Sequence, residues 1–206
     1  MGGARPAACY EFADEMTLTD FHFPLDLRLF QLANRDGGPW LDAAMRALST
    51  HTFGIGFGLL LGCWLLAALG RRAFRPLLAL AVAILVSDFV GSHLLRPIFA
   101  RMRPCYALPP GTFRWLAPAA NGSSLPSLHA ANMFALAWVV LLARPRLAPL
   151  AFAVALAVSF SRVYLGVHWP SDVAAGALWG TLAAAAGWAV SGAVHERASG
   201  ASPPPG

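Results

Sequence analysis

The chain contains no lysine, and charged residues of all kinds make up only 12% of its 206 residues. Its 15 basic residues are all arginine, and with 10 acidic residues they give a formal net charge of +5. An ordinary soluble domain carries about 25% charged residues. The shortage of charge therefore argues against a soluble protein. No basic helix or aromatic-studded basic strand is present either, so we expect no nucleic-acid partner.

Cysteine is also scarce. The three cysteines, Cys9, Cys63 and Cys105, form no CxxC pair and show no metal-ligand spacing. Such spacing is the usual sequence signature of a zinc or redox site. We therefore expect no metal site and no cofactor.

The first 24 residues lack the basic region and apolar core that are typical of a signal peptide. They contain four acidic residues instead, namely Glu11, Asp14, Glu15 and Asp20. We therefore expect a loose polar leader over residues 1–24, and insertion of the chain through internal spans.

Hydrophobic residues, at 57%, are abundant and gather in long blocks. A helix needs about 20 apolar residues to cross a bilayer. The blocks predict five spans near 52–69, 74–95, 127–143, 147–165 and 171–192. In the first span, Gly54, Gly58 and Gly62 share one face, where another helix could approach closely. The length suits one domain, and the predicted fold class is an all-α polytopic membrane helix bundle.

Two shorter segments, 25–33 and 40–49, alternate apolar and charged residues with a helical period. They are too short and too charged to span a membrane, so we expect amphipathic helices at its interface. The tail 198–206 contains Pro203, Pro204 and Pro205 and is expected to be disordered.

The arginines also predict a topology. Six of them flank two short turns and the end of the last span: Arg71, Arg72, Arg75, Arg144, Arg146 and Arg197. With five spans, all six fall on one side, which the positive-inside rule makes cytoplasmic. The long loop 96–126 then faces outward with Arg96, Arg101, Arg103 and Arg114, against the rule. Phosphate binding would explain arginines in that place.

Three segments on that outer side carry chemistry: 96–104, 125–130 and 161–172. Pro126 and Pro170 each precede a span and suit the first turn of a helix. They place His129 in the first turn of one span and His168 just before another, with Asp172 in that helix's first turn. Helix N-termini bind anions, and arginine holds phosphate oxygens in bidentate fashion. The set indicates phosphoryl transfer with nucleophilic and acid–base partners.

The same three segments resemble the signature of the type 2 phosphatidic acid phosphatase superfamily, which reads Lys-x6-Arg-Pro, Pro-Ser-Gly-His and Ser-Arg-x5-His-x3-Asp. The matching positions are Arg103-Pro104, Pro126-Ser127, His129, Ser161-Arg162, His168 and Asp172. Two positions depart from the pattern. Arg96 stands where the family has lysine, which changes reach and geometry. Leu128 stands where it has glycine, which removes easy access to positive φ.

The resemblance implies a role for each matching residue. His168 would attack phosphorus to form a phosphohistidine, and Asp172 would fix its tautomer. His129 would protonate the leaving oxygen and later activate water. The phosphate-binding group would be Arg96, Arg103, Ser127, Leu128 and Arg162. The family chemistry needs no metal.

Together these expectations describe a membrane-embedded phosphatase domain over residues 25–197. The layout resembles compact bacterial members acting on undecaprenyl diphosphate, in the inner membrane with the site facing the periplasm or the outside. Phosphatidylglycerophosphate or phosphatidate phosphatase, or a lipid phosphotransferase, stays an alternative. A haloperoxidase is disfavoured by the spans, and a non-catalytic lipid-binding protein would not need both histidines. The expected partners are the lipid substrate and membrane lipids.

For three charged residues the sequence allows two roles each. Arg101 and Arg114 could extend to lipid headgroups or belong to the site. Asp88 lies within a span, where an acid is usually paired. It could orient an arginine of the pocket or make a hydrogen bond between helices.

Overall fold

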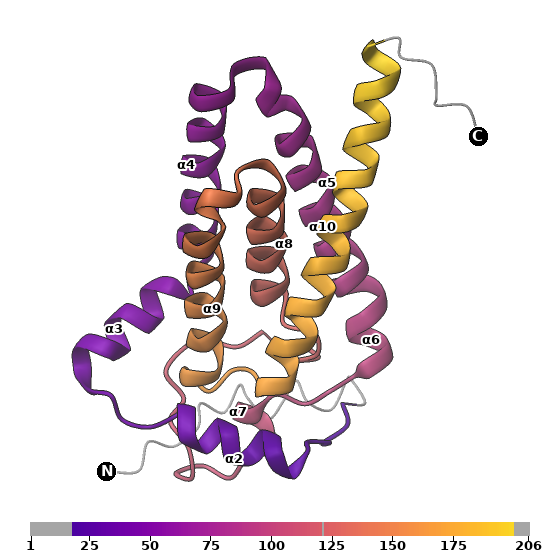
Figure 1. Cartoon of the computed structure of the whole chain (residues 1–206). Coiled ribbons are helices and arrows are strands. Elements are labelled where there is room, and N and C mark those ends of the chain that lie inside the picture. Colours follow the sequence, from indigo (N-terminus) through magenta and orange to yellow (C-terminus); the bar gives the residue numbers. More distant parts are fainter. Residues whose placement is uncertain (1–17, 121, 200–206) are drawn as a thin grey trace.

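Helices make up most of the computed structural model, which describes residues 18–120 and 122–199 (Figure 1). In those residues there is no β-strand, only an isolated bridge between Thr19 and Arg101. The predicted all-α fold is therefore confirmed. Most of the predicted leader, residues 1–17, and most of the predicted tail, residues 200–206, lie outside the described part of the chain.

Two N-terminal helices precede the long ones. The α-helices in the described residues are α2 (Pro24–Ala33), α3 (Gly38–Leu48), α4 (His51–Leu69), α5 (Phe74–Val90), α6 (Arg96–Phe99), α7 (Pro104–Ala107), α8 (Leu128–Ala143), α9 (Ala148–Tyr164) and α10 (Pro170–Ser199). The 3₁₀ turns Gly70–Ala73 and Pro145–Leu147 join α4 to α5 and α8 to α9. A π-helical turn, Gly91–Leu95, leads from α5 into α6.

Local chemistry accounts for several of these boundaries. The hydroxyl of Thr50 accepts a hydrogen bond from the Phe53 N–H at 3.1 Å and so caps the start of α4. Gly70 ends α4 with a φ of 53°, a conformation that favours glycine. Pro170 opens α10, where its missing N–H leaves no helical hydrogen bond unmade.

The long helices form an up-and-down bundle in which α4 and α5 make one antiparallel pair and α8 and α9 another (Figure 1). Helix α10 packs mainly against α5 and α8. The core between them is rich in alanine, including Ala79, Ala83, Ala135 and Ala137. Small side chains let the helix backbones approach closely.

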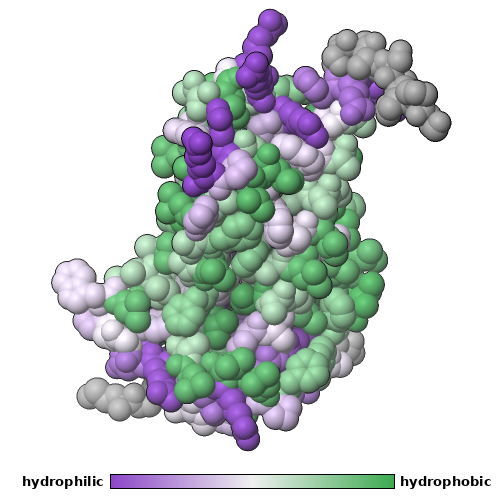
Figure 2. All heavy atoms as spheres, in the orientation of Figure 1, coloured by the Kyte–Doolittle hydropathy of each residue, from purple (hydrophilic) through white to green (hydrophobic). Residues whose placement is uncertain are grey.

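Three helical stretches are long and apolar enough to cross a membrane: His51–Phe99, Pro145–Tyr164 and Pro170–Arg197, with Leu128–Ala143 a shorter apolar helix. The predicted spans 52–69 and 74–95 both lie within the first stretch, which reverses at the turn after α4. Apolar side chains cover the middle of the visible face and charged ones gather toward its two ends (Figure 2).

Close helix contacts occur at glycines of α10, not of α4. A Cβ at Gly180 would lie 2.0 Å from the backbone oxygen of Ala131, and one at Gly187 would lie 2.3 Å from that of Ala79. Near Gly54 and Gly58, by contrast, the described residues place no atom within 4 Å of such a Cβ. At Gly62 a Cβ would lie 3.7 Å from the Leu77 side chain of α5, an ordinary contact. The expectation that the α4 glycines admit a neighbouring helix is therefore not met at Gly54 and Gly58 within this part of the chain, because α4 lies at the bundle's edge.

The N-terminal helices are fastened to the bundle end where α10 begins. The buried ring of Phe30 on α2 packs 5.4 Å from that of Trp169. The amide of Asn34 donates to the backbone oxygens of Arg114 and Tyr164 at 2.8 and 2.7 Å. The opposite face of α2 exposes Leu25, Leu29 and Leu32. The helix predicted for 25–33 is therefore confirmed, and its place at the membrane interface stays a prediction.

Candidate active site

The three predicted segments meet at one end of the bundle. Arg103 precedes α7, Ser127 is the N-cap of α8, and His168 lies between α9 and α10. The backbone N–H of Ser127 donates to the backbone oxygen of Asp172 at 3.0 Å, which ties the first turn of α8 to that of α10. A Cβ at Gly176 would lie only 2.4 Å from the Ser127 oxygen, so α10 can approach this closely only with glycine there.

The neighbours of His168 specify its tautomer. Arg103 Nη1 lies 3.0 Å from Nε2, and an arginine can only donate, so Nε2 accepts and carries no proton. On the other side of the ring, Nδ1 donates to Asp172 Oδ2 at 3.3 Å. The imidazole is therefore neutral, with its lone pair directed toward a guanidinium.

Burial and charge both oppose protonation of His168. Burial of the ring, and then nearby positive charge, holds the pKa of His168 well below its ordinary value of 6.5. Those charges belong to Arg103, Arg162, Arg96 and, when protonated, His129. Residues from all three predicted segments thus act on one imidazole.

Three buried polar atoms near this ring have no hydrogen-bonding partner among the described residues. They are Ser127 Oγ, His129 Nε2 and Arg162 Nε. Buried polar atoms are nearly always paired, so an unpaired group of donors indicates room for an oxygen-rich ligand. The far edge of the Arg162 guanidinium is held, since Nη1 donates to the backbone oxygen and hydroxyl of Ser49. The imidazole of His129 lies 4.9 Å from that of His51.

Arg96 and Leu128, the two departures from the family pattern, have identifiable neighbours. Arg96 is half-buried, and its Nε donates to the Pro126 oxygen at 3.3 Å. Leu128 is the first residue of α8, so its backbone is helical and needs no positive φ. Its side chain lies over Gly91, where a Cβ would come within 2.5 Å of Leu128 Cδ2. A glycine on the facing helix therefore provides the space that the larger residue requires.

Arg101 is a residue of this site that the sequence left open. Its side chain is 0% exposed and donates from Nη1 to Asp172 Oδ1 at 2.6 Å. The headgroup interpretation is therefore wrong for Arg101. From Nη2 it donates to Asp26 on α2, also at 2.6 Å. Asp26 was missed altogether, because in the sequence it is one of several polar residues on an amphipathic helix.

The other two open residues have hydrogen-bonding partners outside the cluster. Arg114 pairs with Asp42 of α3 at 2.7 Å and with Asp36 at 3.3 Å, so it joins the N-terminal helices to the long loop. Asp88 accepts a hydrogen bond from the Asn132 amide at 2.9 Å, which supports the interpretation of a contact between helices. Across residues 18–120 and 122–199, no group of three or more His, Cys, Asp or Glu residues is placed to hold a metal ion.

Comparison with known families finds a match to the family described as the PAP2 superfamily, over residues 73–196. Lipid A 4'-phosphatase of Bacteroides thetaiotaomicron is 34% identical over 117 residues, which cover 53% of this chain and 51% of that protein. YbjG of Escherichia coli is 32% identical over 167 residues, covering 77% and 78%. Undecaprenyl-diphosphatase of Sulfolobus acidocaldarius is 34% identical over 112 residues, covering 54% and 53%. Two of these three matches therefore span about half of the relative.

Two solved structures share the fold. The crystal structure of Aquifex aeolicus LpxE superposes with a TM-score of 0.62 at 26% identity, covering 80% of this chain and 95% of that one. A transmembrane PAP2-type phosphatidylglycerolphosphate phosphatase from Bacillus subtilis superposes with a TM-score of 0.59 at 21% identity, covering 93% and 90%. The likeness to the second protein concerns the fold alone.

Proposed function

Because the chain belongs to the PAP2 superfamily, we propose that it is a membrane lipid phosphatase that works through a phosphohistidine on His168. The observation that carries the proposal is the neutral, buried imidazole held between Asp172 and Arg103. A nucleophile must direct its lone pair at phosphorus, so a phosphate bound by Arg103 would have to replace the contact between Arg103 Nη1 and His168 Nε2. No other described histidine has a carboxylate on one ring nitrogen and a guanidinium on the other.

The reaction would proceed in two steps. In the first, the Nε2 lone pair of His168 forms a bond to phosphorus while the bond to the lipid oxygen breaks, and His129 donates a proton to that oxygen. In the second, His129 removes a proton from water as the water oxygen attacks phosphorus, and the P–N bond breaks to release phosphate. Asp172 stabilises the positive charge that develops on the ring. Arg96, Arg103, Arg162, the Ser127 hydroxyl and the Leu128 N–H would bind the phosphoryl oxygens.

For the substrate we favour undecaprenyl diphosphate, on the strength of the undecaprenyl-diphosphatase from S. acidocaldarius. The site would face the outside of a bacterial inner membrane, since the arginine-rich turns lie at the opposite end of the bundle. The second candidate is a lipid A phosphate, because the relative named for that activity is equally similar in sequence. The shared chemistry is a phosphate ester or anhydride at the membrane surface.

A phosphate-release assay in detergent tests the mechanism. We expect His168→Ala and His129→Ala to lose at least about a thousandfold in kcat, because each removes a group that acts only in the chemical steps. His195→Ala is the matched control, since His195 is exposed near the other end of α10. Equal rates in all four proteins would refute the assigned roles.

A substrate panel then separates the candidates. Undecaprenyl diphosphate, lipid A, phosphatidylglycerophosphate and phosphatidate would be compared by kcat/KM in the same detergent. We expect the highest value for undecaprenyl diphosphate. A higher kcat/KM for lipid A would favour the second candidate, and transfer of phosphate to an added lipid alcohol would indicate a phosphotransferase.

A further inference from the structure

A buried chain of charges runs from the first N-terminal helix to the proposed nucleophile. Asp26, Arg101 and Asp172 expose 4%, 0% and 0% of their side chains. Arg101 Nη2 donates to Asp26 and Nη1 donates to Asp172, each at 2.6 Å. Asp172 in turn accepts from His168 Nδ1. In Figure 1, α2 crosses the end of the bundle where α10 begins, which brings Asp26 into this position.

The contacts leave little freedom to either carboxylate. Asp26 Oδ1 accepts from the Ser171 N–H at 2.8 Å, and Oδ2 accepts from the Ser171 hydroxyl at 2.6 Å. Asp172 Oδ2 also accepts from the Trp169 N–H at 2.8 Å. The remaining guanidinium nitrogen, Arg101 Nε, donates to the Phe21 oxygen at 2.9 Å. Asp26 therefore accepts hydrogen bonds both from Arg101 and from the first turn of α10, the helix that carries Asp172.

The ionisation of Asp26 also affects the charge near His168. Burial alone would raise the pKa of Asp26, but hydrogen bonds from Ser171 and Arg101 outweigh burial and lower it, so the carboxylate is ionised. Asp26, Arg101 and Asp172 together then carry one net negative charge, which opposes the positive charges of the other arginines around His168. If Asp26 were neutral, Arg101 would cancel the charge of Asp172. The ring must become cationic when it binds phosphorus, so it needs that uncancelled charge in a buried place where screening is weak.

We infer that Asp26 is a positioning residue for catalysis, which acts through Arg101 to orient Asp172 and to preserve its negative charge toward His168. The inference rests on the proposed function. It makes α2 part of the catalytic machinery and not only a helix on the membrane surface. Asp26 touches no reacting atom, so its effect should fall on the chemical step and not on phosphate binding.

Asp26→Asn tests the inference. We expect kcat to fall by at least about tenfold, as for other residues that orient a functional group, with KM within about threefold of the wild-type value. The phosphate pocket is unchanged in this variant, so inhibition by inorganic phosphate should be unchanged too. Asp26→Glu keeps the charge and should recover part of the lost kcat.

Asp42→Asn is the matched control. Asp42 also pairs an N-terminal helix with an arginine of the long loop, Arg114, but makes no hydrogen bond or ion pair with Asp172 in the described part of the chain. Removing it should lower thermal stability in detergent while kcat per folded molecule stays at the wild-type level. A merely structural Asp26 would behave in the same way.

A double-mutant cycle adds a second readout. Arg101→Gln breaks the connection between the two carboxylates, so adding Asp26→Asn to it should cost far less than Asp26→Asn costs alone. Adding Asp42→Asn to Arg101→Gln should leave kcat unchanged. If Asp26→Asn matches Asp42→Asn in kcat, or is additive with Arg101→Gln, the inference is overturned while the proposed function stands. Absence of phosphate release by the wild type would overturn both.

Discussion

His168 is surrounded by groups that prefer its neutral form. The ring is buried, Arg103 donates to one nitrogen, and Asp172 accepts from the other. A free histidine in water would be about half protonated near pH 6.5. Here the folded protein has removed the competing proton before any substrate arrives. His168 therefore presents an unprotonated nitrogen inside a pocket whose arginines favour anions.

This environment predicts the pH dependence. The nucleophile must be unprotonated, and its pKa lies well below 6.5 in the folded chain. We therefore expect kcat/KM to stay constant as the pH falls through 6.5, with its acidic limb at lower pH. Arg103→Gln removes a positive charge next to the ring, so the pKa of His168 should rise. The acidic limb of kcat/KM should then move to higher pH, and kcat/KM should be lower than that of the wild type. A wild-type limb at or above pH 6.5 would contradict this assignment.

At the scale of elements, α10 determines how closely the catalytic segments approach one another. Its glycines lie against the backbones of α5 and α8, and its first turn carries Asp172. Helix association in a membrane depends on such close packing, because lipid tails are as apolar as the side chains they would replace. Within the described chain, glycines of α10 lie close to neighbouring backbones, whereas those of α4 are open or in ordinary contact with a side chain.

Gly180→Ala should therefore destabilise the bundle. The added Cβ would meet the Ala131 backbone oxygen at 2.0 Å, so the two helices must separate, at a cost of about 1–3 kcal/mol. Gly58→Ala on α4 is the control, since no described atom lies within 4 Å of its Cβ. Thermal unfolding in detergent should show a lower Tm for Gly180→Ala only. Equal Tm values in the two variants would argue against close packing at Gly180.

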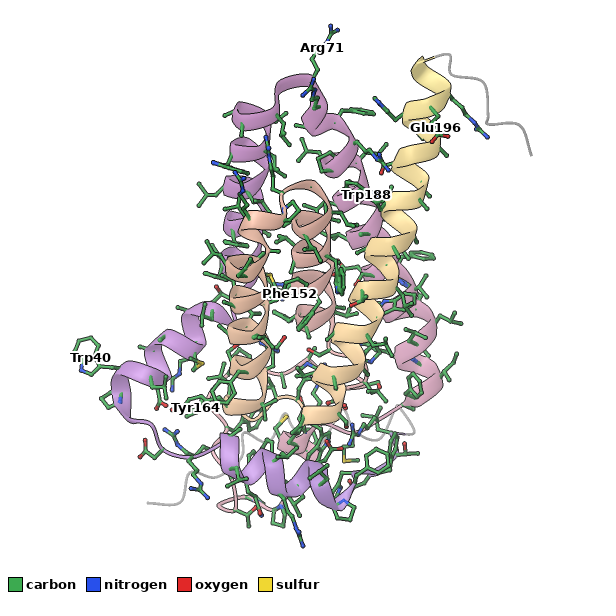
Figure 3. The ribbon with its side chains drawn as sticks, in the orientation of Figure 1. Trp40, Arg71, Phe152, Tyr164, Trp188 and Glu196 are labelled. Atoms are coloured by element: carbon green, nitrogen blue, oxygen red, sulfur yellow. The ribbon has the colours of Figure 1, made fainter. Side chains whose placement is uncertain are left out.

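At the scale of the whole molecule, this integral membrane protein has two chemically different ends. Figure 3 labels Arg71 and Glu196 at one end and Tyr164 toward the other, with Phe152 and Trp188 between them. The end with Arg71 bears exposed arginines of the turns between helices. At the other end, Arg101 and Arg103 are buried and Arg114 is paired, but Arg28, Arg35 and Arg46 of the N-terminal segment are exposed. The positive-inside rule counts arginines in short loops and near the ends of spans. We attribute the arginines of the long loop to the site, so the rule then predicts a cytoplasmic position for the end with Arg71.

Cysteine labelling in intact bacterial cells tests the resulting orientation. Thr112→Cys, on an exposed part of the long loop, should react with a membrane-impermeant reagent, because we place that loop outside. Arg71→Cys should react only after permeabilisation. The chain without an introduced cysteine measures the background from Cys9, Cys63 and Cys105. The reverse pattern would place the active site in the cytoplasm.

Much of this protein follows from the sequence alone. Long apolar blocks determine helices, because a buried backbone must satisfy its own hydrogen bonds. Prolines at the starts of α8 and α10 place His129 and Asp172 at helix N-termini, and the spacing from His168 to Asp172 allows one to orient the other. The family, the helices and the matched site positions could therefore be read before any coordinates were known.

Only the tertiary structure decided the partners of those residues. The pairing of Asp26 with Arg101 joins positions 75 residues apart, and no local pattern encodes a contact between an amphipathic helix and a distant loop. The same holds for Leu128, whose space comes from Gly91 on another helix. The physical reason is that local sequence determines which face of a helix is apolar, whereas buried charges and close backbone contacts depend on how separate helices pack together.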